Sequence, residues 1–245
     1  MLKFFRRIRQ KLVKEGNLKR YLVYAIGEIL LVVIGILIAL QVNNWNEERR
    51  DSKTLISILE NEKISIAIEI EKEETQIQLI NGWIDTVLNA QIIIEEVDVP
   101  TPQHQKVLDK AFEVLTYLGL RTRKIEHLQS LSQSISRSKL TGKNEVVRTI
   151  SQLIDGFGLG KDLLDIHQEN LLNHDRSLNS DVLRFNSKDE AVYNFELMKT
   201  DNQFQHYLTR SRGHKISSRN TGVRIVENYK LLNDQIEELL KELEK

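Results

Sequence analysis

The chain has 245 residues, with 35 basic and 35 acidic side chains, so its overall charge gives no attraction to nucleic acid. It contains no cysteine, which excludes a disulfide, a thiolate metal site and a cysteine nucleophile. Two prolines and 11 glycines are too few for a collagen-like or disordered chain, and the abundance of Leu, Ile, Glu, Lys and Gln predicts helices.

The N-terminal segment is strongly basic. Residues 1–20 hold eight Lys or Arg and one Glu, a net charge of +7, so the rest of the chain has a net charge of −7. Phe4, Ile8 and Leu12 recur at a four-residue spacing among these basic residues. The pattern is typical either of a short helix on the anionic inner leaflet or of a tail that only sets topology. We predict that residues 1–20 form a cytoplasmic tail.

Residues 21–44 are predicted to form a transmembrane helix. Within residues 22–42 only Glu28 and Gln41 are strongly polar. At about 1.5 Å per residue this stretch extends about 31 Å, which matches one hydrocarbon thickness. A buried helix of a soluble domain and a cleaved signal peptide are the alternatives. No small-residue cleavage site follows the apolar run, so we expect an uncleaved signal anchor.

The flanks of this segment define its ends and its orientation. Tyr21 and Tyr24 stand at one end and Trp45 at the other, where aromatic side chains prefer the membrane interface. A basic tail precedes the segment and a nearly neutral flank follows it. The positive-inside rule therefore places the N-terminus in the cytoplasm and residues 45–245 outside it. No second apolar run of spanning length occurs, so we predict a single-pass protein.

Four residues of the span are candidates for packing against another helix. Gly27, Gly35 and Ala39 share one face, where small side chains allow close approach, although glycine is also ordinary in spans. Glu28 is an intramembrane carboxylate, which is costly unless it is paired, protonated or hydrated. It is interpreted as the partner of a basic residue in another span, as a proton-coupled site, or as a neutral or snorkelling group near the inner interface. We expect the lipid bilayer and either a homo-oligomer or a membrane-protein partner around this helix.

The residues around the span resemble a known bacterial family. Residues 24–49, which end in Gln-Val-Asn-Asn-Trp-Asn-Glu-Glu-Arg, and the basic, Phe-rich residues 3–9 carry the resemblance. It is weaker at residues 202–208 and in the last helix. The family, domain of unknown function 6090, consists of single-span proteins common in flavobacteria and their relatives. Since it has no assigned activity, the resemblance implies a bacterial inner membrane with a periplasmic C-terminal domain, and it implies no catalytic residues.

The outer domain, residues 45–245, is predicted to begin with a long helix. No proline occurs between Asn43 and Ile94. Isoleucines alternate over residues 64–70, as in a strand, but the flanking Glu and Lys residues and the wider spacing favour a helix. Asn81-Gly82 is a candidate kink. The apolar seam of this helix, interrupted by Glu73, comprises Trp45, Ile56, Leu59, Ile66, Ile70, Ile77, Ile80, Ile84 and Val87.

Proline, glycine and capping residues divide the remaining chain. Two prolines within residues 99–102 end the long helix. Helices are predicted at 108–118, 125–135 and 146–183, the last interrupted by the glycines of 156–160. Capping boxes at Ser187 to Glu190 and at Thr200 to Gln203 predict helices from 187 to Lys199 and beyond 200. The last helix has an apolar stripe of Ile225, Tyr229, Leu232, Ile236, Leu239 and Leu243.

The fold class that follows is all-α. One N-terminal transmembrane helix precedes an elongated antiparallel helical bundle, with coiled-coil-like packing between its first and last long helices. Each of these two helices buries little by itself, so each needs the other or a second copy of the chain.

Three further patterns have a chemical and an ordinary interpretation. The glycines of residues 156–160 lack the spacing of a Rossmann or Walker loop, which favours a helix break over phosphate binding. His167 and His174 share a helix face, but a metal site needs about three converging ligands, so a solvated face is favoured. The basic run 210–224 indicates a solvated face, a partner's acidic patch or membrane phosphates. The segment 43–99, with a net charge of −8, is one candidate for that patch.

These patterns predict no catalytic residue, no metal site, no cofactor and no nucleic-acid partner, and they identify no small molecule. We predict a non-enzymatic, single-span inner-membrane protein whose periplasmic helical bundle binds a partner. Two alternatives stay open. One is an accessory subunit of a membrane transport or secretion complex, and the other is an envelope enzyme without a recognisable motif.

Overall fold

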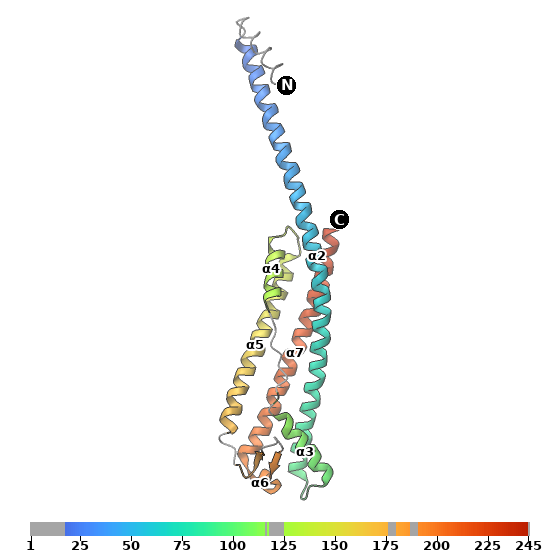
Figure 1. Ribbon diagram of the computed structural model, residues 1–245, viewed down its shortest axis with the longest axis vertical. Coiled ribbons are helices and arrows are strands. Elements are labelled where there is room, and N and C mark those ends of the chain that lie inside the picture. The colour runs from blue at the N-terminus through green and yellow to red at the C-terminus, as the bar shows by residue number, and fades with distance from the viewer. Residues whose placement is uncertain (1–17, 116, 118–124, 176–179, 187–190, 245) are drawn as a thin grey trace. The chain divides into compact units, whose positions relative to one another are not determined.

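The computed structural model describes residues 18–115, 117, 125–175, 180–186 and 191–244. Contacts divide the chain into two units, residues 1–55 and residues 56–245, and helix α2 (Leu18–Glu96) contributes to both. Most described residues are helical, so the all-α prediction is confirmed (Figure 1). The predicted boundaries at residues 20 and 44 refer to a membrane and stay predictions.

The second unit contains the remainder of α2 and all other elements. In chain order these are α3 (Pro102–Leu115), α4 (Glu126–Arg137), α5 (Lys143–Asp175), β1 (Leu183–Phe185), β2 (Ala191–Tyr193), α6 (Phe195–Thr200) and α7 (Asn202–Leu243). Helix α2 ends before Pro100, and α3 begins with Pro102 in its first turn, where a missing N–H costs nothing. With 42 residues, α7 extends about 63 Å, which makes the bundle elongated as predicted.

Helices α2 and α7 run antiparallel, as the sequence predicted. From one contact to the next, the residue number rises along α2 and falls along α7. The ammonium of Lys63 lies 2.6 Å from the Glu237 carboxylate, and that of Lys230 lies 2.8 Å from the Glu74 carboxylate. The Gln91 side-chain amide donates to the Thr209 hydroxyl at 3.2 Å.

The face of α2 toward the bundle follows a seven-residue repeat. Six positions at this spacing are at most 2% exposed: Leu59, Ile66, Glu73, Ile80, Val87 and Ile94. The helix continues through the alternating isoleucines and through Asn81-Gly82 without a break. Trp45, which the predicted seam included, is 61% exposed and is not part of this core. A strict heptad repeat keeps one edge of a helix against its partner over many turns.

Helix α7 also packs against α5. An added Cβ atom on Gly142 would lie 3.5 Å from Leu239, and one on Gly156 would lie 3.5 Å from Ile225. Helix α5 continues through residues 156–160, so the predicted helix break there is wrong. The contact at Gly156 gives the reason, because close packing against α7 supports a helical conformation that glycine by itself disfavours.

The segment between α5 and α7 differs from the prediction. Ala191–Tyr193 forms strand β2, which pairs antiparallel with β1, so the helix predicted from residue 187 to Lys199 is wrong over these residues. Helix α6 begins only after Asn194, whose side chain accepts hydrogen bonds from the next turn. The N-cap of α7 is Asp201, whose carboxylate accepts from the Phe204 N–H at 2.9 Å, and not Thr200. Residues 187–190 lie outside the described residues.

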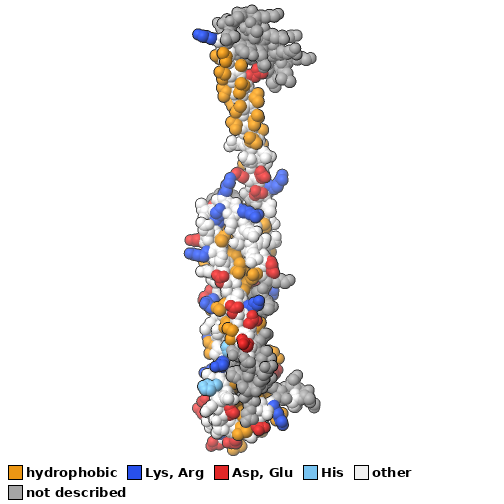
Figure 2. Space-filling model, turned by 90° about the vertical axis from the view of Figure 1, so that its left-hand side faces the viewer, with side chains coloured by type: hydrophobic (Ala, Val, Ile, Leu, Met, Phe, Trp, Pro, Cys, Tyr) orange, Lys and Arg blue, Asp and Glu red, His pale blue; other side chains and the backbone are white. Residues whose placement is uncertain are grey.

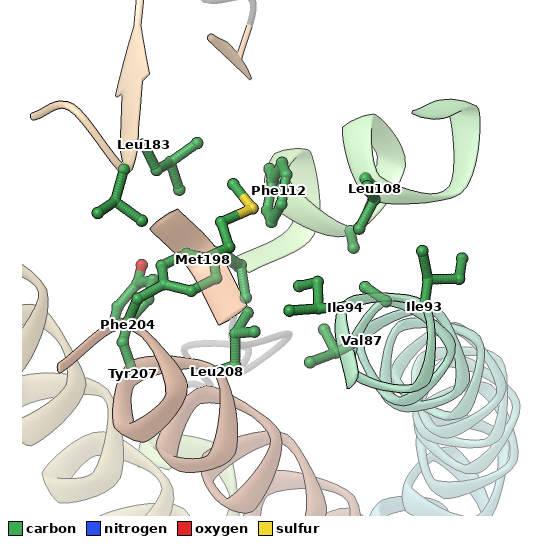
Figure 3. Close-up of a cluster of buried hydrophobic side chains, with 14 of the residues drawn as sticks. Val87, Ile93, Ile94, Leu108, Phe112, Leu183, Met198, Phe204, Tyr207 and Leu208 are labelled. Atoms are coloured by element: carbon green, nitrogen blue, oxygen red, sulfur yellow. The ribbon is translucent and has the colours of Figure 1, made fainter. Parts of the chain in front are cut away.

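A hydrophobic cluster closes the end of the bundle where α3, α6 and the strands meet. Figure 3 shows side chains of α2, α3, α6 and α7 pointing toward one another around Phe112 and Met198. The Phe112 ring lies edge-on to Tyr193 and to Phe204, with centroid distances of 5.1 and 6.1 Å. The Tyr193 hydroxyl also hydrogen-bonds Asp109, which joins the strand pair to α3.

Candidate functional site

The apolar part of α2 lies uncovered in the first unit. Among the described residues this is the one helix long and apolar enough to cross a membrane, and none of its most apolar 18-residue window is buried. Every side chain from 29 to 50 is exposed. In Figure 2 hydrophobic side chains cover most of the visible face of this segment. A continuous apolar surface of this kind marks contact with a membrane or a partner.

The predicted packing residues of the span lie on this uncovered helix. An added Cβ atom on Gly27 or Gly35 would have no atom within 4 Å, and Ala39 is exposed. Glu28 is half-buried. Both glycines therefore leave room for the close approach of another helix, and the association itself stays a prediction.

The predicted interface aromatics are only partly described. Trp45 is largely exposed, and its place at a membrane interface stays a prediction. The side chains of Tyr21 and Tyr24 lie outside the described residues, as does the whole basic segment 1–17.

A buried lysine is the most unusual polar group of the bundle. Lys215 in α7 is 0% exposed, and its ammonium donates to the Leu115 carbonyl at 3.3 Å and to the Ser211 hydroxyl at 3.1 Å. Ser211 donates to the same carbonyl at 3.1 Å. Leu115 is the last residue of α3, so both side chains satisfy the negative end of that helix. Burial lowers the pKa of Lys215 from 10.5 to about 8.

Residue type alone does not reveal the burial of Lys215, because a basic run such as 210–224 is typical of a surface. A signal was present, since the apolar stripe of α7 continues toward the N-terminus at three- and four-residue spacing. Its additional buried positions are Leu208, Ser211, Lys215, Ser218 and Gly222. Arg210 and Arg224 of the same run are exposed. Next to Lys215, burial and then the charges of Arg210 and Lys215 lower the pKa of His214.

Two carboxylates of α2 lie toward the interior of the bundle, Glu73 buried and Glu62 partly buried. Glu73 is 1% exposed and faces α7 beside Gly222, where an added Cβ atom would lie 3.9 Å from its Oε2. Glu62 lies 3.7 Å from Nε2 of His127 in α4. Burial raises the pKa of Glu62, and the attraction of His127 opposes this shift. The sequence placed Glu73 on the seam, whereas the contact between Glu62 and His127 depends on the tertiary fold.

The other sequence-predicted patterns do not converge on one site. Residues 156–160 lie in the middle of α5, and the side chains of His167 and His174 lie outside the described residues. Among the side chains that the structure describes, no group of three or more His, Cys, Asp or Glu could hold a metal ion.

Among the comparisons with known proteins, one family model matches, and it matches the first part of the chain. The comparison with curated proteins gave no match, and neither did the comparison with solved structures. The resemblance indicated by the sequence is confirmed over residues 28–96, which match the model described as "Family of unknown function (DUF6090)".

Proposed function

We propose that this chain is a single-span protein of a bacterial inner membrane whose periplasmic helical bundle binds a protein partner and catalyses no reaction. The uncovered apolar run of α2 carries the proposal, because a stretch of about 20 predominantly apolar residues matches the thickness of a bilayer. In water the same surface would promote aggregation. The N-terminal charge of +7 supports an orientation with the N-terminus in the cytoplasm.

Binding is supported by how the bundle is built. The seams of α2 and α7 are buried against each other and against α3 and α5, so the bundle has its own core. An anchored domain with its own core is suited to hold a partner near the membrane. The periplasmic side, the partner and the absence of catalysis are parts of the proposal.

The absence of cysteine allows a sharp test of topology. Ser130 is exposed in α4, so Ser130→Cys provides one accessible thiol in the bundle. Asn17→Cys provides a matched thiol before the span. With a membrane-impermeant maleimide, intact spheroplasts should label Ser130→Cys and should label Asn17→Cys only after lysis. The reverse pattern would refute the orientation. An N-terminal epitope that is lost from the mature protein would refute the uncleaved anchor.

The partner is tested by crosslinking in cells, followed by purification of the full chain in mild detergent. A protein that is recovered with the wild type, and that is recovered equally when only the span is exchanged for another, would place binding in the bundle. Loss of the partner when only the span is exchanged would instead favour an accessory subunit of a multispan complex. Recovery of the chain by itself under all crosslinking conditions would contradict the proposal.

A further inference from the structure

An open groove separates the end of α2 from the start of α3, which lie side by side in Figure 1. Its volume is about 990 Å³, which reaches the upper end of the usual size of a ligand site. Helix α2 contributes two polar residues to its lining, and the rest come from the N-cap and first two turns of α3. The lining residues are Thr86, Asn89, Thr101, Pro102, Gln103, Lys106, Val107 and Lys110.

The described lining of this groove carries two positive charges. Lys106 and Lys110 are exposed, and no carboxylate is among the lining residues that the structure describes. Neither ammonium has an ion-pair partner among the described residues. Glu113, one turn further along α3, is outside the lining. Two exposed cations without a described ion-pair partner favour an anionic ligand.

The hydrogen-bonding groups of the groove point to a peptide. Asn89 and Gln103 are exposed, and their side-chain amides have no hydrogen-bond partner among the described residues. An amide both donates and accepts, which matches the alternating N–H and C=O groups of an extended chain. Pro102 and Val107 add an apolar surface, and none of the described lining residues is aromatic. The described lining thus offers no ring on which a sugar could stack, which disfavours a glycan.

The spacing of the two lysines refines this match. Side chains four residues apart on a helix are about 6 Å apart at their Cβ atoms. In an extended peptide, side chains two residues apart point to the same side at a separation of about 6.6 Å. Two acidic side chains at alternate positions can therefore each meet one ammonium. We infer that this groove binds an extended acidic segment of a partner protein, with Glu or Asp at every second residue.

This inference rests on the proposed function, because it supplies the binding site for the protein partner of the bundle. It is tested with the full chain in detergent and a fluorescein-labelled ten-residue peptide in which Glu and Ser alternate. A second peptide has the same composition but five consecutive glutamates. The alternating peptide should bind more tightly than the block peptide, and its affinity should fall as salt rises, because both ion pairs are exposed.

Variants locate the binding on the protein. The double change Lys106→Gln and Lys110→Gln should weaken binding of the alternating peptide about tenfold, since it removes two exposed ion pairs. The matched control, Lys53→Gln with Lys161→Gln, removes the same charge from two exposed lysines elsewhere and should leave the affinity unchanged within about twofold. Equal weakening by both double variants would overturn the site, as would equal affinity for the two peptides or no binding by the wild type.

Two further outcomes separate this inference from the proposed function. Polygalacturonate is tested as an anionic glycan. Tighter lysine-dependent binding of polygalacturonate would assign the groove to a glycan and overturn the peptide inference. If a crosslinked partner is recovered equally with wild type and with the Lys106 and Lys110 variant, the bundle binds its partner elsewhere. The proposed function would then stand while the inference about the groove fails.

Discussion

The buried ammonium of Lys215 gives a prediction with a defined sign and size. Burial of the charged Lys215 ammonium destabilises the folded state, because the ammonium loses its hydration. Its hydrogen bonds to the uncharged Leu115 carbonyl and Ser211 hydroxyl compensate only part of that loss. Replacement by methionine keeps a similar side-chain volume and removes the charge. The Leu115 carbonyl would still accept from the Ser211 hydroxyl. We therefore expect Lys215→Met to be at least as stable as the wild type at pH 7.

The size of the effect follows from the pKa. Burial lowers the pKa of Lys215 from 10.5 to about 8, and a shift of this size corresponds to about 3 kcal/mol. Between pH 8 and pH 10.5 the unfolded chain binds more protons than the folded chain, so stability rises with pH in this window. Below pH 8 both states are protonated and the full cost remains. The wild type should thus gain up to about 3 kcal/mol over the window, and Lys215→Met should lack this gain.

The assay is urea unfolding of the full chain in detergent, followed by far-ultraviolet circular dichroism from pH 7 to pH 10.5. Tyr193, whose pKa is raised to about 12 by burial and by Asp109, also affects stability at the alkaline end. Its contribution is the same in both proteins and cancels in their difference. The control Lys161→Met alters an exposed lysine and should follow the wild-type pH dependence. A constant difference between wild type and Lys215→Met across the window would refute the desolvation argument, and so would marked destabilisation of the variant at pH 7.

Four further predictions concern the helices. Gly213→Ala should raise the free energy of unfolding by up to about 1 kcal/mol through its higher helix propensity, since an added Cβ meets no atom within 4 Å. Gly222→Leu should lower the free energy of unfolding by about 1–3 kcal/mol, because its Cβ would lie only 3.1 Å from Ile77; thermal unfolding checks both, and shifts of the same sign in the two variants would contradict this packing. Burial raises the pKa of Glu62, so the wild type should gain stability as pH falls from 7 toward 4.5, and Glu62→Gln should not; urea midpoints over this range check the sign. Gly35→Ile should reduce crosslinking of the span to another helix, and wild type without any such crosslink would end that prediction.

Local patterns in the sequence determined much of the helical architecture. An apolar run long enough for a bilayer is recognisable from composition alone, because every residue contributes independently to transfer into lipid. The end of α2 before Pro100 follows from a covalent property of proline. The antiparallel pairing of α2 and α7 followed from two amphipathic stripes, neither of which is stable by itself. The candidate residues of the span were likewise read from local composition, and their association awaits the crosslinking test.

Other features depended on contacts between distant segments. The glycines of residues 156–160 indicated a break, yet α5 continues there because Gly156 packs against Ile225 of α7. The segment before α6 carried a helix signal, but its residues 191–193 pair with β1 instead. In both cases a weak local preference was outweighed by tertiary packing, which no window of neighbouring residues contains.

The candidate sites show the same division. Lysine is a residue type that usually lies on the surface. Lys215 lies against the end of α3 because it falls on the same face of α7 as the buried apolar stripe. The groove also needs the fold, because Asn89 and Lys110 meet only after the prolines reverse the chain between α2 and α3. A helix period is local and can be read from the sequence. Which of its faces meets another helix, and which residues become buried there, is decided by the free energy of burying surfaces that are far apart in the chain.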